Sequence, residues 1–176
     1  MDYPVGIREN GGQYTHAVTW YIMALIKLGA KDKAYEYYQM INPINRSLTK
    51  KDVQKYKVEP YVIAADIYSN PDMPGRGGWT WYTGSAGWFY NIGITEILGL
   101  KKEGNILRFK PSVPHSWKSF EVEYKYMDTL YKIKVNFSGS KEMGILVDGD
   151  KINKNYITLK NDKRIHAVIV NGGTND

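Results

Sequence analysis

The sequence predicts an α+β chain in which the helices precede Gly99 and the strands follow it. Through most of residues 13–98, apolar side chains recur three and four positions apart, which is the spacing of amphipathic helices. After Gly99 they alternate with polar side chains, which is the spacing of half-buried strands. Because the two patterns are segregated, we expect two structural units, residues 1–98 and 99–176, in place of one βαβ sheet.

Several segments of the first part have helical spacing, and each has a recognisable start or end. Gly29 ends the first segment, Asn42-Pro43 ends the second, and Gly99 ends the last. Pro60 suits the first position of a helix, and Thr83 or Ser85 suits the cap before the last one. The expected helices cover residues 13–28, 31–41, 49–56, 60–68 and 85–98.

The second part is predicted to be an antiparallel β-domain. Asp148-Gly149 marks a hairpin, since this pair suits a turn whose two central residues both need positive φ. Single lysines alternate with apolar residues, as in YKIKVNF, which is typical of a strand with one solvated face. The expected strands cover residues 105–111, 120–126, 130–137, 143–152 and 166–172.

Composition and charge exclude several classes of protein. The net charge of +6 arises mainly after Gly99, where fourteen Lys or Arg face nine Asp or Glu, and we assign it to solvated strands in place of nucleic-acid contacts. No cysteine is present, which excludes thiol chemistry and disulfides and favours a reducing, cytoplasmic location. The chain has no apolar run long enough to span a membrane, and its first residues do not resemble a signal peptide.

The stretch RENGGQYTH places Arg8, Glu9, Asn10 and His16 around a Gly-Gly loop that enters a helix. A helix entrance offers unpaired N–H groups and the positive end of a dipole, so polar side chains there can meet a polar or anionic ligand. The alternative is structural: the glycines and Asn10 form a turn, and His16 is a cap or a satisfied polar group.

The stretch GRGGWTWYTGSAGW, residues 75–88, combines glycines with tryptophans before another helix entrance. Its Thr83-Gly84-Ser85 segment can receive an anion, although the lysine of a nucleotide-binding loop is absent. Its tryptophans either fill the core or offer flat faces to sugar rings. Glu59, directly before Pro60, either caps a helix or binds sugar hydroxyls. Spacings typical of metal, dinucleotide and serine-hydrolase sites are missing, so no metal or nucleotide cofactor is expected.

Six motifs, in this order, resemble the C-terminal portion of the glycoside hydrolase family of cellobiose and chitobiose phosphorylases. They are ENGGQYTHA, INPIN, YKVEPYVIAADIYS, GRGGWTWYTGSAGW, GITEILGL and PSVPHSWKSFEVEY, and they cover about residues 6–137. The residues of these motifs most resemble the branch of β-1,2-glucan phosphorylases and cyclic β-1,2-glucan synthases. This branch is glycosyltransferase 36-like. The resemblance implies the last helices of an (α/α)6 barrel over residues 1–98, followed by an antiparallel β-sandwich tail over 99–176.

The resemblance also implies a reaction, the inverting phosphorolysis of a β-glucosidic bond to α-glucose 1-phosphate. Phosphate replaces the water of an ordinary inverting hydrolase, so an anion site takes the place of the catalytic base. The matching motifs place phosphate at His16, Thr83 and Gly84. We expect Glu9, Glu59 and Trp81 beside the sugar because they lie near these motifs. The general acid and a further phosphate-binding arginine of the family are expected upstream, so no catalytic residue is assigned, and neither Asp66 nor Arg8 is given these roles.

Three readings of the function stay open. The first is a fragment of a sugar phosphorylase or β-glucan synthase that is inactive alone, with β-glucan oligosaccharide and phosphate as partners and phosphate as co-substrate. An incomplete helical bundle, and a Met just ahead of a motif-dense loop, favour this reading. The second is a stand-alone carbohydrate-binding module, and the third a structural or assembly domain. A homodimer is compatible with each of them.

Overall fold

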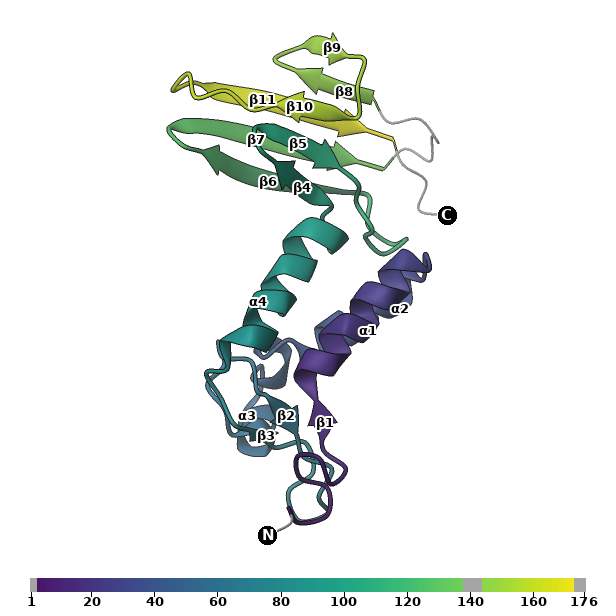
Figure 1. Ribbon diagram of the computed structural model, residues 1–176, viewed down its shortest axis with the longest axis vertical. Coiled ribbons are helices and arrows are strands. Elements are labelled where there is room, and N and C mark those ends of the chain that lie inside the picture. Colours follow the sequence, from purple (N-terminus) through teal and green to yellow (C-terminus); the bar gives the residue numbers. More distant parts are fainter. Residues whose placement is uncertain (1–2, 138–143, 173–176) are drawn as a thin grey trace. The chain divides into compact units, whose positions relative to one another are not determined.

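The chain divides into two compact units, Met1–Gly93 and Ile94–Asp176, in the computed structural model (Figure 1). The structure describes residues 3–137 and 144–172. The division precedes Leu98, where the sequence placed the domain boundary, because Ile94 and Leu98 both pack against the core of the second unit. Mixed helix and sheet agree with the predicted α+β class.

The first unit is mainly helical, and three of its helices lie where apolar spacing predicted them. The helices are α1 (Thr15–Lys27), α2 (Lys31–Ile41), the 3-10 turn η1 (Ile44–Arg46), α3 (Lys50–Tyr56), and α4 (Thr83–Asn91), which is followed by the π turn η2 (Ile92–Ile97). Thr49 and Asp52 form a capping box that starts α3. Gly29, with a φ of 80°, follows α1 as its predicted stop.

The predicted helix over residues 60–68 is wrong. Residues 62–66 are all buried, which a surface helix with one apolar face cannot achieve. Their backbone groups bond to distant segments: the Thr15 N–H donates to the Ala65 carbonyl at 2.9 Å, and the Ala65 N–H donates to the Trp79 carbonyl at 2.8 Å. Tertiary hydrogen bonds therefore hold this segment extended, and Glu59 caps no helix.

A small antiparallel sheet crosses the first unit, in the order β1, β2, β3. Its strands are β1 (Gln13–Tyr14), β2 (Asp66–Ile67) and β3 (Gly77–Gly78). Asp66 pairs with Tyr14 on one side and with Gly78 on the other. The sheet therefore joins the loop before α1 to the loop before α4.

The second unit consists of two sheets that share one hydrophobic core. One sheet has the order β10, β5, β4, with β4 (Leu100–Glu103), β5 (Ile106–Phe109) and β10 (Tyr156–Thr158). The other has the order β6, β7, β11, β8, β9, with β6 (Ser119–Tyr126), β7 (Thr129–Asn136), β8 (Gly144–Val147), β9 (Asp150–Ile152) and β11 (Ile165–Asn171). Leu107 and Phe109 from the first sheet and Ile133 and Val170 from the second lie in the same buried cluster.

The sequence predicted most of these strands but not all of their pairings. Asp148 and Gly149 have φ of 52° and 92°, which confirms the predicted hairpin turn. Strands β4 and β10 were not foreseen, and β11 runs parallel to β7, so the larger sheet is mixed. Met143, the first residue of the predicted strand 143–152, lies outside the described residues.

Two lysines of the second unit, Lys132 and Lys134, lie on a solvated strand face, as predicted. Along β7, side chains alternate between buried and exposed, and Lys132 and Lys134 are exposed. They pair with Glu123 and Glu121 of β6 at 3.6 and 2.9 Å. Within residues 3–137 and 144–172, no helix is long and apolar enough to cross a bilayer, and no group of three His, Asp or Glu side chains is placed to hold a metal ion.

We expect Gly99→Ala to destabilise the protein far more than Gly104→Ala. Both glycines have positive φ, of 70° and 60°. A Cβ at Gly99 would lie 2.1 Å from the carbonyl of Lys110, whereas nothing lies within 4 Å of one at Gly104. Backbone strain alone costs about 1 kcal/mol, and the clash should raise the cost at Gly99 to about 3 kcal/mol. Chemical denaturation followed by circular dichroism measures both losses, and equal losses would contradict the role of the Lys110 contact.

Candidate functional site

A cavity of about 330 Å³ lies in the first unit, beside the starts of α1 and α4. It is lined by residues from three separate segments: Tyr14, His16, Ala65, Trp81, Tyr82, Thr83, Gly84 and Ser85. All three predicted phosphate residues and one predicted sugar residue therefore border one cavity. Glu9 and Glu59 are not among its lining residues.

The β1–β2–β3 sheet brings these segments together. Strand β1 leads directly into α1, whose second residue is His16. Strand β3 leads into the tryptophan segment and then into α4, which begins at Thr83. Since β2 pairs with both strands, residues almost seventy positions apart in the sequence reach the same place.

The N-terminus of α4 is open toward this cavity. Tyr82 precedes the helix, and no side chain caps the first turn. Gly84 lies close to the imidazole, because a Cβ built there would be 3.4 Å from His16 Cε1 and 3.6 Å from His16 Nδ1. The first N–H groups of a helix have no partner within the helix and carry a partial positive charge. An anion in this cavity would meet those groups and the imidazole together.

The His16 side chain is held among aromatic rings. Its ring centroid lies 4.8 Å from that of Trp20 and 6.3 Å from that of Trp88. The Nε2 atom is buried and has no hydrogen-bond partner among the described residues. A buried polar atom without a partner costs free energy, so such an atom beside a cavity indicates a place where a ligand can supply the missing bond.

Trp79 and Trp81 are exposed, which is contrary to a role in the core. Their side chains have relative exposures of 53% and 66%, and both residues have positive φ, at 40° and 64°. The indole N–H of Trp81 donates to Glu59 Oε1 at 3.2 Å, and the ring of Tyr61 meets it edge-on. Glu59 therefore orients an exposed indole at the edge of the cavity. Trp88 alone of the three tryptophans of this stretch is half-buried.

The loop before β1 contacts the tryptophan segment through Arg8. The guanidinium of Arg8 lies 5.1 Å from the ring centroid of Trp79, within the range of a cation–π interaction. Glu9 is exposed and forms an ion pair with Arg8 at 3.8 Å. Asn10 donates to the carbonyl of Tyr3 and thus shapes the loop itself. Of the residues in RENGGQYTH, only His16 and Tyr14 line the cavity.

Asp66 is a buried carboxylate whose importance the sequence analysis missed. It is 2% exposed, its Oδ2 accepts the Arg8 N–H at 3.2 Å, and its Oδ1 has no partner among the described residues. Burial raises the pKa of Asp66, while the Arg8 N–H bond and charge oppose that rise. A Cβ at Gly78 would lie 2.7 Å from Oδ1, so the carboxylate fills the space beside that glycine. An aspartate inside the apolar run VIAADIY was the signal available in the sequence.

The comparisons with known proteins identify the family of the chain. Residues 1–99, more than half of the chain, match the catalytic domain of the glycosyl hydrolase 94 superfamily. The class of protein is therefore that of the glycosyl hydrolases. More particularly, the chain belongs to the glycosyl hydrolase 94 superfamily, which confirms the resemblance seen in the sequence motifs.

Relatives in this superfamily include a glucan synthase and several phosphorylases. The cyclic beta-(1,2)-glucan synthase NdvB of Rhizobium meliloti is 42% identical over 87% of this chain, and the N,N'-diacetylchitobiose phosphorylase of Vibrio furnissii is 32% identical over 84%. The 1,2-beta-oligoglucan phosphorylase of Listeria innocua is 28% identical over 82%. The chain spans 5%, 18% and 14% of the lengths of these three relatives.

We expect Asp66→Asn to stabilise the protein at pH 7. A carboxyl group with a raised pKa in the folded state makes folding less favourable once the pH exceeds that pKa, so removing the charge should add about 1 kcal/mol. The gain should shrink as the pH falls through the raised pKa of Asp66, where the carboxylate itself takes up a proton. Thermal unfolding at several pH values measures this gain, with Asp72→Asn, at an exposed position, as control. A loss of stability at pH 7 would show that the charge itself is needed.

Proposed function

We propose that this chain supplies part of the phosphate and sugar site of an inverting β-glucan phosphorylase or cyclic β-glucan synthase. Its helices would be the last ones of an (α/α)6 barrel. The observation that carries the proposal is the cavity in which the His16 imidazole lies beside the open N-terminus of α4. Two relatives named as phosphorylases and one named as a glucan synthase are consistent with this assignment.

Phosphate suits this cavity for three reasons. The open end of α4 offers backbone N–H groups at Thr83 and Gly84, which favour an anion. The hydroxyl of Thr83 adds a donor that can follow the phosphate oxygens. Finally, the buried Nε2 of His16 has no partner among the described residues. Phosphate would therefore supply hydrogen bonds to helix N–H groups that have no partner within the helix.

A sugar would lie on the side of the cavity where Trp81 is exposed. Flat pyranose faces stack on indole rings, and carboxylates accept bonds from sugar hydroxyls. Glu59 holds the indole by one oxygen, which leaves its other oxygen for a hydroxyl. The positive φ of Trp79 and Trp81 costs about 1–3 kcal/mol each, a kind of strain that clusters at ligand-binding segments. Glu9 would approach the sugar only through its contact with Arg8.

In the proposed reaction, a phosphate oxygen attacks the anomeric carbon while the glycosidic bond to the leaving oxygen breaks. A carboxylic acid must protonate that leaving oxygen. The described lining of the cavity contains no Asp or Glu. We therefore propose that the acid comes from a segment outside this chain. The chain alone would bind phosphate but produce no glucose 1-phosphate from β-1,2-glucooligosaccharides.

We expect Gly84→Ala to weaken phosphate binding at least tenfold without destabilising the chain. The new methyl group would lie 3.4 Å from His16 Cε1, an ordinary contact that the fold tolerates, yet it would occupy the space between the imidazole and the helix end. Phosphate titration at constant ionic strength, followed by the NMR signals of His16, measures the affinity.

Gly87→Ala is the matched control for this experiment. Gly87 belongs to the same helix, and nothing lies within 4 Å of a Cβ built there. Both variants gain helix propensity, so only the contact with the cavity differs between them. Equal phosphate affinity in the two variants would contradict the site, and glucose 1-phosphate formation by the chain alone would contradict the separate acid.

A carbohydrate-binding role without phosphorolysis is the second candidate, favoured by the exposure of Trp81. We expect Glu59→Ala to weaken binding of β-1,2-glucooligosaccharides about tenfold, because the indole loses its hydrogen-bond partner. Glu59→Gln keeps an oxygen that can accept the indole N–H and should bind more tightly than the alanine variant. Tryptophan fluorescence titration compares the variants. Sugar binding that is unchanged in both variants, with no phosphate response at His16, would contradict both roles.

A further inference from the structure

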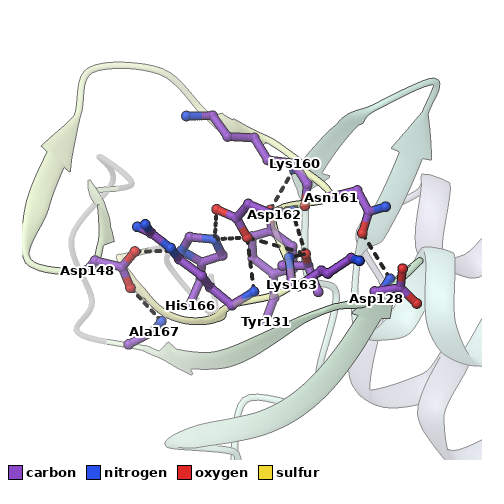
Figure 2. Close-up of polar contacts among 11 residues, drawn as sticks. Asp128, Tyr131, Asp148, Lys160, Asn161, Asp162, Lys163, His166 and Ala167 are labelled. Atoms are coloured by element: carbon purple, nitrogen blue, oxygen red, sulfur yellow. Dashed lines mark hydrogen bonds and ion pairs between the residues drawn. The ribbon is translucent and has the colours of Figure 1, made fainter.

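His166 of β11 lies between two carboxylates in the second unit (Figure 2). Its Nδ1 is 2.6 Å from Asp148 Oδ2, and its Nε2 is 3.1 Å from Asp162 Oδ2. Asp148 belongs to the turn between β8 and β9, and Asp162 to the loop between β10 and β11. One imidazole therefore contacts both the turn that follows β8, a strand paired with β11, and the loop that leads into β11.

Each carboxylate is also held by backbone or hydroxyl groups. The Ala167 N–H donates to Asp148 Oδ1 at 2.8 Å, and the Arg164 N–H donates to Asp162 Oδ1 at 3.2 Å. The Thr129 hydroxyl donates to Asp162 at 3.3 Å and accepts the Asp162 N–H at 2.9 Å. These groups orient each carboxylate within its own segment, and the imidazole is the side chain that links the two carboxylates to each other.

Strand β7 contributes Tyr131, which packs against His166. The ring of Tyr131 stacks on the imidazole, with centroids 5.0 Å apart and an angle of 25° between the planes. Its hydroxyl accepts the Lys160 N–H at 2.7 Å, so the start of the β10–β11 loop is fixed to the same ring. The titratable side chains labelled around His166 in Figure 2 are Asp148 from the β8–β9 turn, Asp162, Lys160 and Lys163 from the segment before β11, Tyr131 from β7, and Asp128 from the turn before β7. Arg164 also belongs to the segment before β11.

Only the protonated imidazole satisfies both carboxylates. An imidazolium donates from both nitrogens, whereas neutral imidazole has one N–H and one lone pair. The bond to Asp148 raises the pKa of His166 above its usual 6.5, and the bond to Asp162 adds to this rise, while partial burial opposes it. The bond from His166 also lowers the pKa of Asp148. The cluster therefore favours the charged state of both partners.

We propose that His166 is a protonation-dependent clamp that tightens the β10–β11 loop through Asp162 when charged and loosens that contact when neutral. The neutral ring keeps its shorter bond, Nδ1–H to Asp148, and turns a lone pair toward the oxygens of Asp162. The lone pair of Nε2 and the carboxylate oxygens of Asp162 repel each other, so the contact between His166 and Asp162 is the first to be lost. All residues of the clamp lie in the second unit, so this inference stands apart from the proposed function.

The clamp also borders a cavity of about 570 Å³. Tyr131, Asp148, Lys160 and His166 line it together with residues of β9 and β10. Solvent can therefore reach the imidazole from this side and exchange its proton without unfolding of the sheet. Loss of the Asp162 contact loosens the loop at one wall of the cavity, which makes the shape of this surface depend on pH.

The sign of the pH dependence follows from the directions of the pKa shifts. The raised pKa of His166 gives stability that is complete below about 6.5 and is lost as the pH rises through the folded-state value. The lowered pKa of Asp148 gives stability that is present above 3.8 and is lost as the pH falls through its folded-state value. The clamp is therefore strongest between roughly pH 4 and 6.5.

Side-chain NMR of the three histidines tests the clamp directly. We expect His166 to titrate above 6.5, with protons on both nitrogens at pH 6. As the pH rises through that value, amide protection factors of residues 160–164 should fall about tenfold, while those of β6 and β7 stay constant. Titration of His166 at or below 6.5, or a loop that keeps its protection, would overturn the proposal.

Asp148→Asn, with Asp150→Asn as control, separates the clamp from the turn. Asn-Gly suits the same turn as Asp-Gly, so the hairpin should form in the first variant. We expect this variant to lower the pKa of His166, and the control to leave it unchanged, since Asp150 is exposed at the start of β9 and, among the described residues, forms no bond with the imidazole. His166→Gln should abolish the pH dependence of loop protection. Identical His166 titrations in the two aspartate variants, or pH-dependent protection that persists without His166, would overturn the proposal.

Discussion

The pairing of β1, β2 and β3 is the constraint on which the candidate site depends. Strand β2 has only two residues, yet it pairs with both loops that lead to the cavity. The bonds from Thr15 to Ala65 and from Ala65 to Trp79 extend this pairing by one step toward α1 and the tryptophan segment. If β2 were displaced, His16 and the N-terminus of α4 would lose the link that holds them side by side at one cavity.

Asp66 is the central residue of this pairing, and its buried charge makes folding of the site less favourable. Its carboxylate accepts the backbone N–H of Arg8, a loop residue with positive φ. The guanidinium of Arg8 in turn contacts the Trp79 ring. Burial opposes the charge of this carboxylate. A side chain that costs stability yet orders both loops is typical of functional segments, where local free energy is given up for geometry.

Local pattern was sufficient for elements whose burial is one-sided. One apolar face is present on each of helices α1 and α2 and strands β6 and β7. Apolar residues recur three and four positions apart in these helices and alternate with polar residues in these strands. Pattern failed over residues 60–68, which are surrounded and bonded by distant segments, and at the parallel pairing of β11 with β7, which no local signal encodes. The association of His16 with Thr83 came from the family resemblance. The bond from Trp81 to Glu59 required coordinates, because it joins residues twenty-two positions apart.

The two units treat their polar groups differently, and the contrast bears on function. Among the described residues, the buried side-chain atoms without a partner are His16 Nε2, Ser47 Oγ and Asp66 Oδ1, all in the first unit. In the second unit, Thr129, Tyr131 and His166 each make several bonds within one connected network. Unsatisfied groups raise the free energy of a folded chain unless something else completes them. Of the three residues with such atoms, only His16 lines the cavity, so its imidazole is the group whose missing bond bears on the proposed site.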